Sequence, residues 1–295
     1  MMISSRSEKH PSSAESSLTT DDKATTQNQR LPALGRVFLF WMGYLAIIAL
    51  GAQPKLMAPE QWQQMTWGLV SSLLLLPLVL LFVRWEKISF RHIGMKFNAG
   101  SLLRGLVGTL IGITIFGVIL LLIALAAGAG AVQFELNTGW QLGAVGGILA
   151  TTFALSCMEE IGFRGYSLCM MVNSLGLWPA QIIVVIAFGL CHIAFGWGWN
   201  AVLMGVIPAA LLFGMGATAS RGLAMPIGLH AGVNLAQWAI SEDRANPDGI
   251  WMLIISEEAQ SYVAAISPFI NIGVILLATG AFWYWHKTRP VEQRN

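Results

Sequence analysis

Long apolar runs dominate this sequence, and short polar connections separate them. Eight such runs can be drawn, at residues 37–52, 66–83, 104–128, 141–173, 176–195, 199–219, 223–241 and 262–285. Several of them approach the ~20 residues that a helix needs to cross a bilayer. Tryptophans near many of the ends support these boundaries, because their amphipathic rings prefer the headgroup level. The pattern therefore predicts an all-α fold, a polytopic membrane helical bundle of about eight transmembrane helices.

The first part of the chain has a different pattern. Residues 1–36 are rich in Ser, Thr, Asp, Gln and Lys and show no hydrophobic periodicity. Such a segment buries too little apolar surface to offset the entropy lost on ordering. We therefore predict a disordered cytoplasmic tail at residues 1–36 and a transmembrane helical domain at residues 37–289.

Composition excludes a water-soluble globule. Hydrophobic residues make up 55% of the chain and charged residues only 11%, whereas soluble domains average about 25% charged residues. We find no internal repeat, heptad pattern, Walker sequence or nucleotide-binding fingerprint. The expected partners are therefore the lipid bilayer and a membrane-associated molecule, and no nucleic acid is expected.

The distribution of Lys and Arg orients the predicted bundle. If the eight segments alternate in direction, nearly all basic residues fall on one side, and only Lys55 and Arg244 fall on the other. Cytoplasmic loops carry the excess of Lys and Arg. We therefore predict a multi-pass protein with both termini cytoplasmic, in the plasma (inner) membrane if the source is bacterial. The acidic loop 241–261 then lies on the opposite side, as a surface connection.

Two adjacent glutamates and an arginine interrupt the fourth apolar run, in the stretch Met158–Gly165. Ionisable groups at membrane depth are costly, and they indicate a functional site by default. On a continuous helix Glu160 and Arg164 are spaced i, i+4 and can pair, while Glu159 points about 100° away. Glu159 is then the candidate general base, and Glu160 and Arg164 form a supporting pair.

Later apolar runs add Phe188 and His192 at i, i+4 spacing, and His230 and Asn234 at the same spacing. A straight antiparallel hairpin with its turn at residues 173–176 brings His192 to the level of Glu160. The same counting leaves His230 about 12 Å shallower, unless the helices before and after that turn extend beyond the membrane.

Two chemical interpretations of these polar residues remain open. His230 and Asn234 could donate hydrogen bonds to a developing oxyanion. They could instead be a metal ligand and its neighbour, with Glu159, His192 and His230 holding a divalent ion such as zinc.

The ordered set Glu159-Glu160-x-x-x-Arg164, Phe188-x-x-x-His192 and His230-x-x-x-Asn234 resembles the motifs of the CPBP intramembrane proteases. That family contains the type II CAAX prenyl endopeptidases and the bacterial Abi-type proteins. The resemblance covers residues 140–240, and the tail and first three segments lie outside it.

The resemblance implies that Glu159 and His192 activate a water, that His230 and Asn234 stabilise the oxyanion, and that Glu160 and Arg164 hold the first motif in shape. It is compatible both with a metalloprotease and with a metal-free, glutamate-activated water. The implied substrate is a membrane-embedded or membrane-associated peptide or protein. Prenylated CAAX proteins belong to the eukaryotic members of the family. In a bacterium we expect a leader peptide, a bacteriocin-like peptide or a membrane protein.

Two other functions fit the same residues. Intramembrane carboxylates and histidines also form ion or proton sites in transporters, although the sequence shows no pair of corresponding broken helices. A catalytically silent membrane scaffold or immunity factor is the other alternative.

Overall fold

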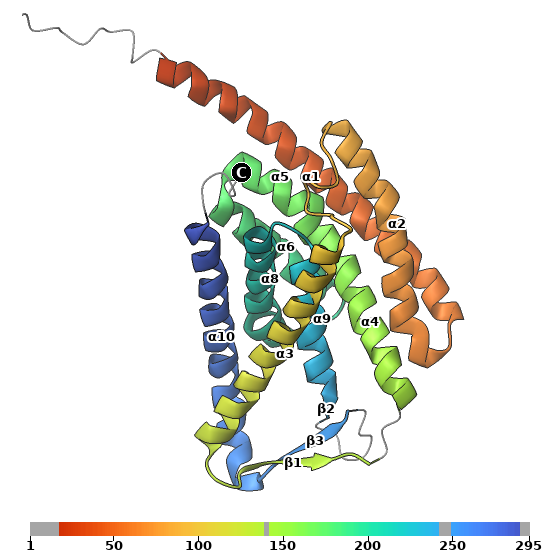
Figure 1. Cartoon of the computed structure of the whole chain (residues 1–295), viewed down its shortest axis with the longest axis vertical. Helices are drawn as coiled ribbons and strands as arrows, with labels where there is room; N and C mark the ends of the chain where they lie inside the picture. The colour runs from red at the N-terminus through yellow and green to blue at the C-terminus, as the bar shows by residue number, and fades with distance from the viewer. Residues whose placement is uncertain (1–17, 139–141, 242–248, 290–295) are drawn as a thin grey trace, which may run out of the picture.

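The computed structural model describes residues 18–138, 142–241 and 249–289, and most of them are helical (Figure 1). The helices are α1 Leu18–Met57, α2 Gln63–Trp85, α3 Ala99–Ala127, α4 Leu142–Glu160, α5 Tyr166–Leu175, α6 Leu177–Ala194, α7 Trp199–Ala201, α8 Ile207–Ser220, α9 Ala224–Ala239 and α10 Glu257–Thr288. A 3₁₀ turn precedes α2 at Glu60–Trp62, and π-helical turns occupy Ile161–Gly165 and Val202–Val206. The prediction of an all-α helical bundle is confirmed.

Six helical stretches among the described residues are long and apolar enough to cross a membrane: Pro32–Met57, Glu60–Trp85, Ala99–Ala127, Leu177–Ala194, Trp199–Ser220 and Glu257–Thr288. The chain is thus a multi-pass membrane protein, and the predicted number of eight spans is approximate. The two predicted segments outside this set are 141–173 and 223–241. They are the segments that carry the glutamate pair and His230.

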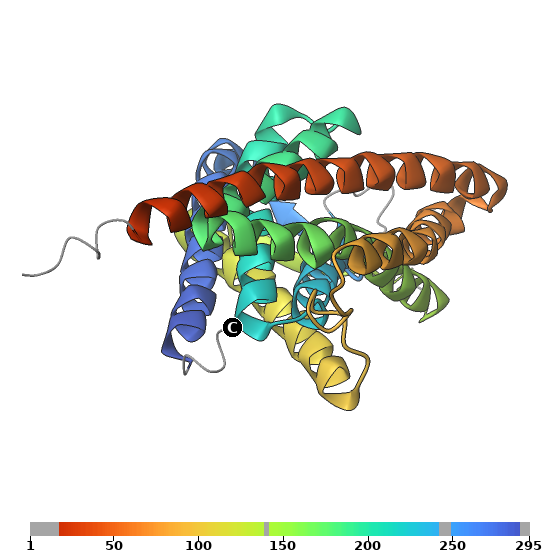
Figure 2. The same cartoon turned by 90° about the horizontal axis from the view of Figure 1, so that it is seen from above.

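The N-terminal helix is longer than the first apolar run. The structure describes residues 18–36, part of the predicted tail, as the beginning of α1, and residues 1–17 lie outside the described part of the chain. Figures 1 and 2 show α1 running obliquely across the bundle, with its first turns extending past the other helices. The division into a tail and a membrane domain stays a prediction.

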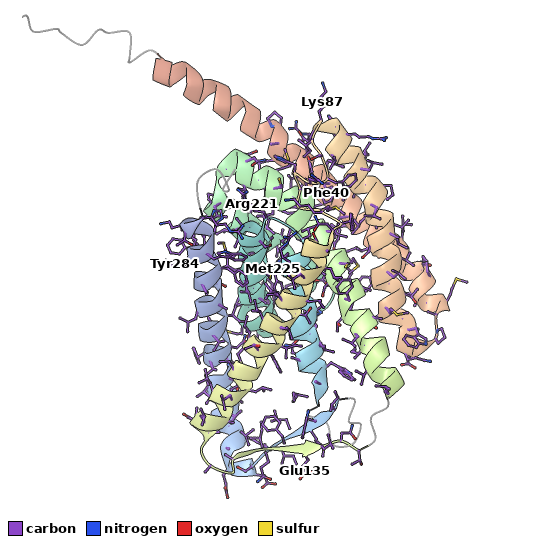
Figure 3. The ribbon with its side chains drawn as sticks, in the orientation of Figure 1. Phe40, Lys87, Glu135, Arg221, Met225 and Tyr284 are labelled. Atoms are coloured by element: carbon purple, nitrogen blue, oxygen red, sulfur yellow. The ribbon has the colours of Figure 1, made fainter. Side chains whose placement is uncertain are left out.

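The two ends of the bundle differ in charge. Figure 3 shows Lys87, which follows α2, and Arg221, which follows α8, at the same end of the molecule. The last turn of α10 lies at that end too, and Glu135 lies at the other. This arrangement agrees with the predicted separation of basic residues. That the basic end faces the cytoplasm stays a prediction.

A small sheet closes the end that carries Glu135. It has the strand order β1–β3–β2, with β1 at Val132–Leu136, β2 at Ile240–Ser241 and β3 at Trp251–Ile255. β1 pairs with β3 in antiparallel fashion, and β2 pairs with β3 in parallel. The sequence predicts a surface connection at 241–261. Its residues 242–248 lie outside the described chain, and β3 forms part of this unpredicted sheet.

Close packing of α3 against α9 holds the centre of the bundle. A Cβ added to Gly228 would lie 2.9 Å from the Thr109 nitrogen, and one added to Gly232 would lie 2.9 Å from the Thr109 carbonyl carbon. Small residues spaced four apart let two membrane helices approach this closely. His230 lies between these two glycines, so the helix contact fixes its position.

Candidate active site

The prediction of one continuous helix over 141–173 is wrong. α4 ends at Glu160, a π-helical turn occupies Ile161–Gly165, and α5 starts at Tyr166. The chain bends between α4 and α5 (Figure 1), and the backbone at Gly165 leaves helical values with ψ −110°. π-helical turns inside helices occur frequently at functional sites. This one directly follows the two glutamates.

Glu160 is the centre of a buried ionic cluster. Its Oε1 accepts a hydrogen bond from Arg164 Nη1 at 3.2 Å, so the predicted i, i+4 pair is present, and neither side chain is exposed to solvent. The same oxygen accepts a second bond from His230 Nδ1–H at 2.9 Å. Arg164 Nη2 also donates to the Ala210 carbonyl at 3.0 Å. The cluster therefore joins the π-helical turn to α8 and α9.

Glu159 takes a different position in the site. Its side chain is 19% exposed, and its Oε2 lies 3.8 Å from His230 Nε2. That distance is too long for a hydrogen bond, and Oε2 has no hydrogen-bond partner among the described residues. Glu160 Oε2 and Arg164 Nε also lack partners there. His230 thus lies between the two glutamates, bonded to one and facing an unbonded oxygen of the other.

Phe188 brings α6 to this cluster. Its ring lies 5.0 Å from the Phe163 ring, 4.3 Å from Arg164 Cζ and 6.4 Å from the His230 ring. A guanidinium over an aromatic face is attracted by the electrons of the ring, most strongly when both are desolvated. Phe188 also contacts His192, one turn later on α6, at 4.6 Å.

His192 and Asn234 form no hydrogen bond or ion pair with either glutamate among the described residues. His192 Nδ1–H donates to the Phe188 carbonyl at 2.9 Å, which leaves Nε2 as an acceptor, and its ring edge meets Trp197 at 5.2 Å. Within the described part of the chain His192 makes no ion pair or hydrogen bond with Glu159. Asn234 is half-buried, one turn after His230 on α9. The structure thus groups Glu159, Glu160, Arg164 and His230, and it connects His192 through Phe188.

Straight-helix counting left His230 about 12 Å shallower than Glu160 unless the helices extend beyond the membrane, and the structure shows no such mismatch, because the two side chains are bonded. That expectation assumed a straight helix from Glu160 to the turn near residue 175. The break at 161–165 removes α5 from the axis of α4, so Glu160 lies at the end of its own helix.

Sequence reasoning missed two contributions from α8. Phe213 stacks on the His230 ring with centroids 4.5 Å apart and an interplanar angle of 18°, and the Ala210 carbonyl accepts from Arg164. Both residues lie in an apolar run without any distinguishing pattern. No signal in a single sequence separates them from ordinary packing residues.

A metal ion at this site would need several side chains positioned as ligands. Zinc in catalytic sites usually has three protein ligands. No three His, Cys, Asp or Glu side chains are grouped to hold a metal ion in the described ranges, although Glu159 and His230 are adjacent. The geometry of the described residues therefore does not fit the ligand set Glu159, His192 and His230.

A cavity of about 600 Å³ lies beside the site, between α3, α4 and α9. Its wall is almost wholly apolar and includes Ile161 and Ala231, each of which follows a cluster residue in sequence. The glutamates, both histidines and Asn234 do not line it. The cavity is thus on neighbouring faces of α4 and α9, separate from the ionic cluster.

Comparison with known proteins identifies the segment that contains the site. Residues 139–236 match the family model described as Type II CAAX prenyl endopeptidase Rce1-like. None of the curated proteins compared with the chain matches it. The matched segment begins just before α4 and ends within α9, so it contains all the residues of the site described above. Over residues 139–236 the chain is therefore similar to the Type II CAAX prenyl endopeptidase Rce1-like family.

Proposed function

We propose that this protein is an intramembrane endopeptidase in which Glu159 removes a proton from a water molecule that attacks the scissile peptide carbonyl. The Rce1-like match supports an intramembrane endopeptidase in general. The observation that carries the specific proposal is the difference between the two glutamates. Glu160 accepts bonds from Arg164 and His230, whereas Glu159 Oε2 lies partnerless beside His230 Nε2.

Charge balance assigns a role to His230. Glu159, Glu160 and Arg164 together carry one net negative charge, and uncompensated charge is costly in a buried site. A protonated His230 cancels that charge. Its Nδ1–H donates to Glu160, so Nε2–H becomes a donor directed toward the space beside Glu159. Fixed donors in a site that excludes water stabilise developing charge strongly.

The first step follows from these donors and acceptors. The water gives one proton to Glu159 Oε2, and its other hydrogen bonds to His192 Nε2, which is an acceptor because Nδ1 carries the proton. The oxygen attacks the carbonyl carbon and forms a tetrahedral intermediate. The oxyanion receives hydrogen bonds from His230 Nε2–H and from the Asn234 amide.

The second step returns the proton. The intermediate collapses, the C–N bond breaks, and protonated Glu159 transfers its proton to the leaving amine. The products are a carboxylic acid and an amine, and Glu159 is again a carboxylate. Throughout the cycle the hydrogen bond to Glu160, which Arg164 holds in place, keeps the His230 ring oriented.

The substrate class follows from the setting. The chain is a multi-pass membrane protein, so a peptide segment must reach the site from within or beside the bilayer. We propose a membrane-associated peptide or protein as the substrate. A prenylated CAAX protein, a leader peptide and a bacteriocin-like peptide are all compatible with this chemistry.

The test is cleavage of a tagged peptide library by purified protein in detergent, with products identified by mass spectrometry. Glu159→Gln should lower the rate by about 10²–10⁴-fold, the usual contribution of a general base. Asn234→Ala should lower it by about 10²–10³-fold through loss of one oxyanion donor. Glu135→Gln, on the exposed strand β1, is the matched control and should leave the rate unchanged. A Glu159→Gln variant that cleaves at the wild-type rate would refute the proposal. A wild-type protein that cleaves nothing would favour the ion-site alternative.

A further inference from the structure

Tyr44 on α1 packs against the π-helical turn from outside the matched segment. Its side chain is almost wholly buried, with 2% exposure. A Cβ added to Gly162 would lie 3.1 Å from Tyr44 Cζ and closer still to two other ring carbons. Only glycine leaves room for the ring there. The carbon that bears the hydroxyl therefore lies over the turn that begins one residue after Glu160.

The same ring is fixed by a second contact. It meets the Phe163 ring in an edge-to-face arrangement at 5.2 Å, and Phe163 in turn packs on Phe188. Aromatic pairs of this geometry add about 0.5–1.5 kcal/mol beyond their area of burial. Tyr44 is thus held in one orientation by residues of the site.

Gly162, which the Tyr44 ring covers, lies three residues after Glu159. Residues three apart on a helix are neighbours on one face, so the ring lies on the face that carries Glu159. Burial normally forces a tyrosine hydroxyl to find a hydrogen-bond partner. None of the described residues forms a hydrogen bond with Tyr44 Oη. The Tyr44 hydroxyl is therefore a free donor beside the turn that follows the two glutamates, and Glu159 Oε2 is an acceptor without a partner among the described residues.

We propose that Tyr44 is a further catalytic residue, whose hydroxyl donates a hydrogen bond to the water that Glu159 deprotonates. The inference rests on the proposed function and extends it to a helix outside the family match. The water then donates one hydrogen bond to Glu159 Oε2 and one to His192 Nε2. One of its lone pairs accepts a hydrogen bond from the Tyr44 hydroxyl. Its remaining lone pair attacks the carbonyl carbon. Tyr44 keeps its own proton throughout, so the step balances without any further reactant.

Tyr44→Phe tests this directly, because it removes the hydroxyl and keeps the ring that supports Gly162 and Phe163. We expect kcat to fall about 10²-fold with little change in KM, since a misplaced reacting group costs a factor of this order. Replacement of Tyr44 by 4-aminophenylalanine, which keeps a donor at the same ring position, should restore much of the rate.

Tyr166→Phe is the matched control. Tyr166 is equally buried, but its hydroxyl donates to Glu86 at 2.8 Å, and Glu86 is not one of the proposed reacting groups. This variant should lose stability and keep its kcat. A Tyr44→Phe enzyme with wild-type kcat, or one whose rate 4-aminophenylalanine does not improve, would overturn the inference.

A second measurement does not depend on peptidase activity. Tyr44→Phe and Glu159→Gln are combined, and thermal unfolding of the single and double variants is compared. Groups that share a hydrogen-bonded partner show non-additive effects on stability. Additive shifts in Tm would overturn the placement of Tyr44 beside Glu159, even if the protein proved to be no peptidase. Non-additive shifts in a protein without peptidase activity would support the placement and reject only the proposed function.

Discussion

Glu159 and Glu160 are adjacent in sequence, yet we expect their replacement by glutamine to affect different properties. Glu160→Gln keeps the volume of the side chain but removes the charge that Arg164 and His230 contact at 3.2 and 2.9 Å. The Glu160 and Arg164 side chains have no solvent exposure, so water cannot replace the lost partner. Leaving one member of a buried ion pair alone costs about 3–5 kcal/mol.

That free energy can be converted into a melting temperature. For domains of about 150–250 residues, 1 kcal/mol corresponds to about 2–4 °C in Tm. Glu160→Gln should therefore melt roughly 6–20 °C below the wild type. Glu159 is partly exposed, and its ionic contact with His230 is 3.8 Å long. Glu159→Gln should shift Tm by about 4 °C or less, because such pairs contribute at most about 1 kcal/mol.

The assay is thermal unfolding in detergent, followed by tryptophan fluorescence, with peptide cleavage measured on the same preparations below every Tm. Glu159→Gln should be folded and inactive, and Glu160→Gln should be destabilised. Glu135→Gln controls for removal of a carboxylate at an exposed site. Equal losses of Tm in the two variants would refute the reasoning that assigns them different roles.

Three further predictions concern topology, metal and helix packing. Single cysteines at Lys55 and Lys87, in a background without the native cysteines, should react with impermeant reagents from opposite faces of the membrane; labelling of both from one face would contradict the predicted orientation. Active protein should keep its activity after prolonged chelation, since no three ligand side chains are grouped to hold a metal ion among the described residues. Stoichiometric zinc that disappears in His230→Ala, with activity lost on chelation and restored by zinc, would contradict this. Gly228→Ala should destabilise the protein by about 1–3 kcal/mol through overpacking of α3 against α9 and should lower activity by displacing His230. Gly117→Ala, whose Cβ meets nothing within 4 Å, is its control, and equal Tm values for the two variants would show that the helix contact is less tight than described.

Several features followed from the sequence by itself because they depend on local properties. Hydropathy over about twenty residues is enough to identify membrane helices, and the segment 37–52 indeed lies within a helix long enough to span, Pro32–Met57. The pairing of Glu160 with Arg164 followed from i, i+4 spacing, and it survives although the residues between them form a π-helical turn. The motif residues likewise pointed to the family that the comparison supports over residues 139–236.

Other features needed the tertiary structure. Counting residues from a turn assumes straight helices. The chain bends after Glu160, so the count gave the wrong depth of His230 relative to Glu160. The stacking of Phe213 on His230 and the approach of Tyr44 to Gly162 join residues far apart in the chain. Apolar patterning does not distinguish these aromatic residues from their neighbours, because every membrane helix is apolar around most of its surface.

The sequence therefore revealed which types of residue form the site, but it did not reveal how these residues are arranged in space. An ionisable residue in an apolar run is conspicuous because its burial is costly wherever the run folds. The packing of α1, α4, α6, α8 and α9 decides which carboxylate oxygens of Glu159 and Glu160 form hydrogen bonds and which have no partner. That packing is set by small residues and ring shapes at helix contacts, which a single sequence does not reveal.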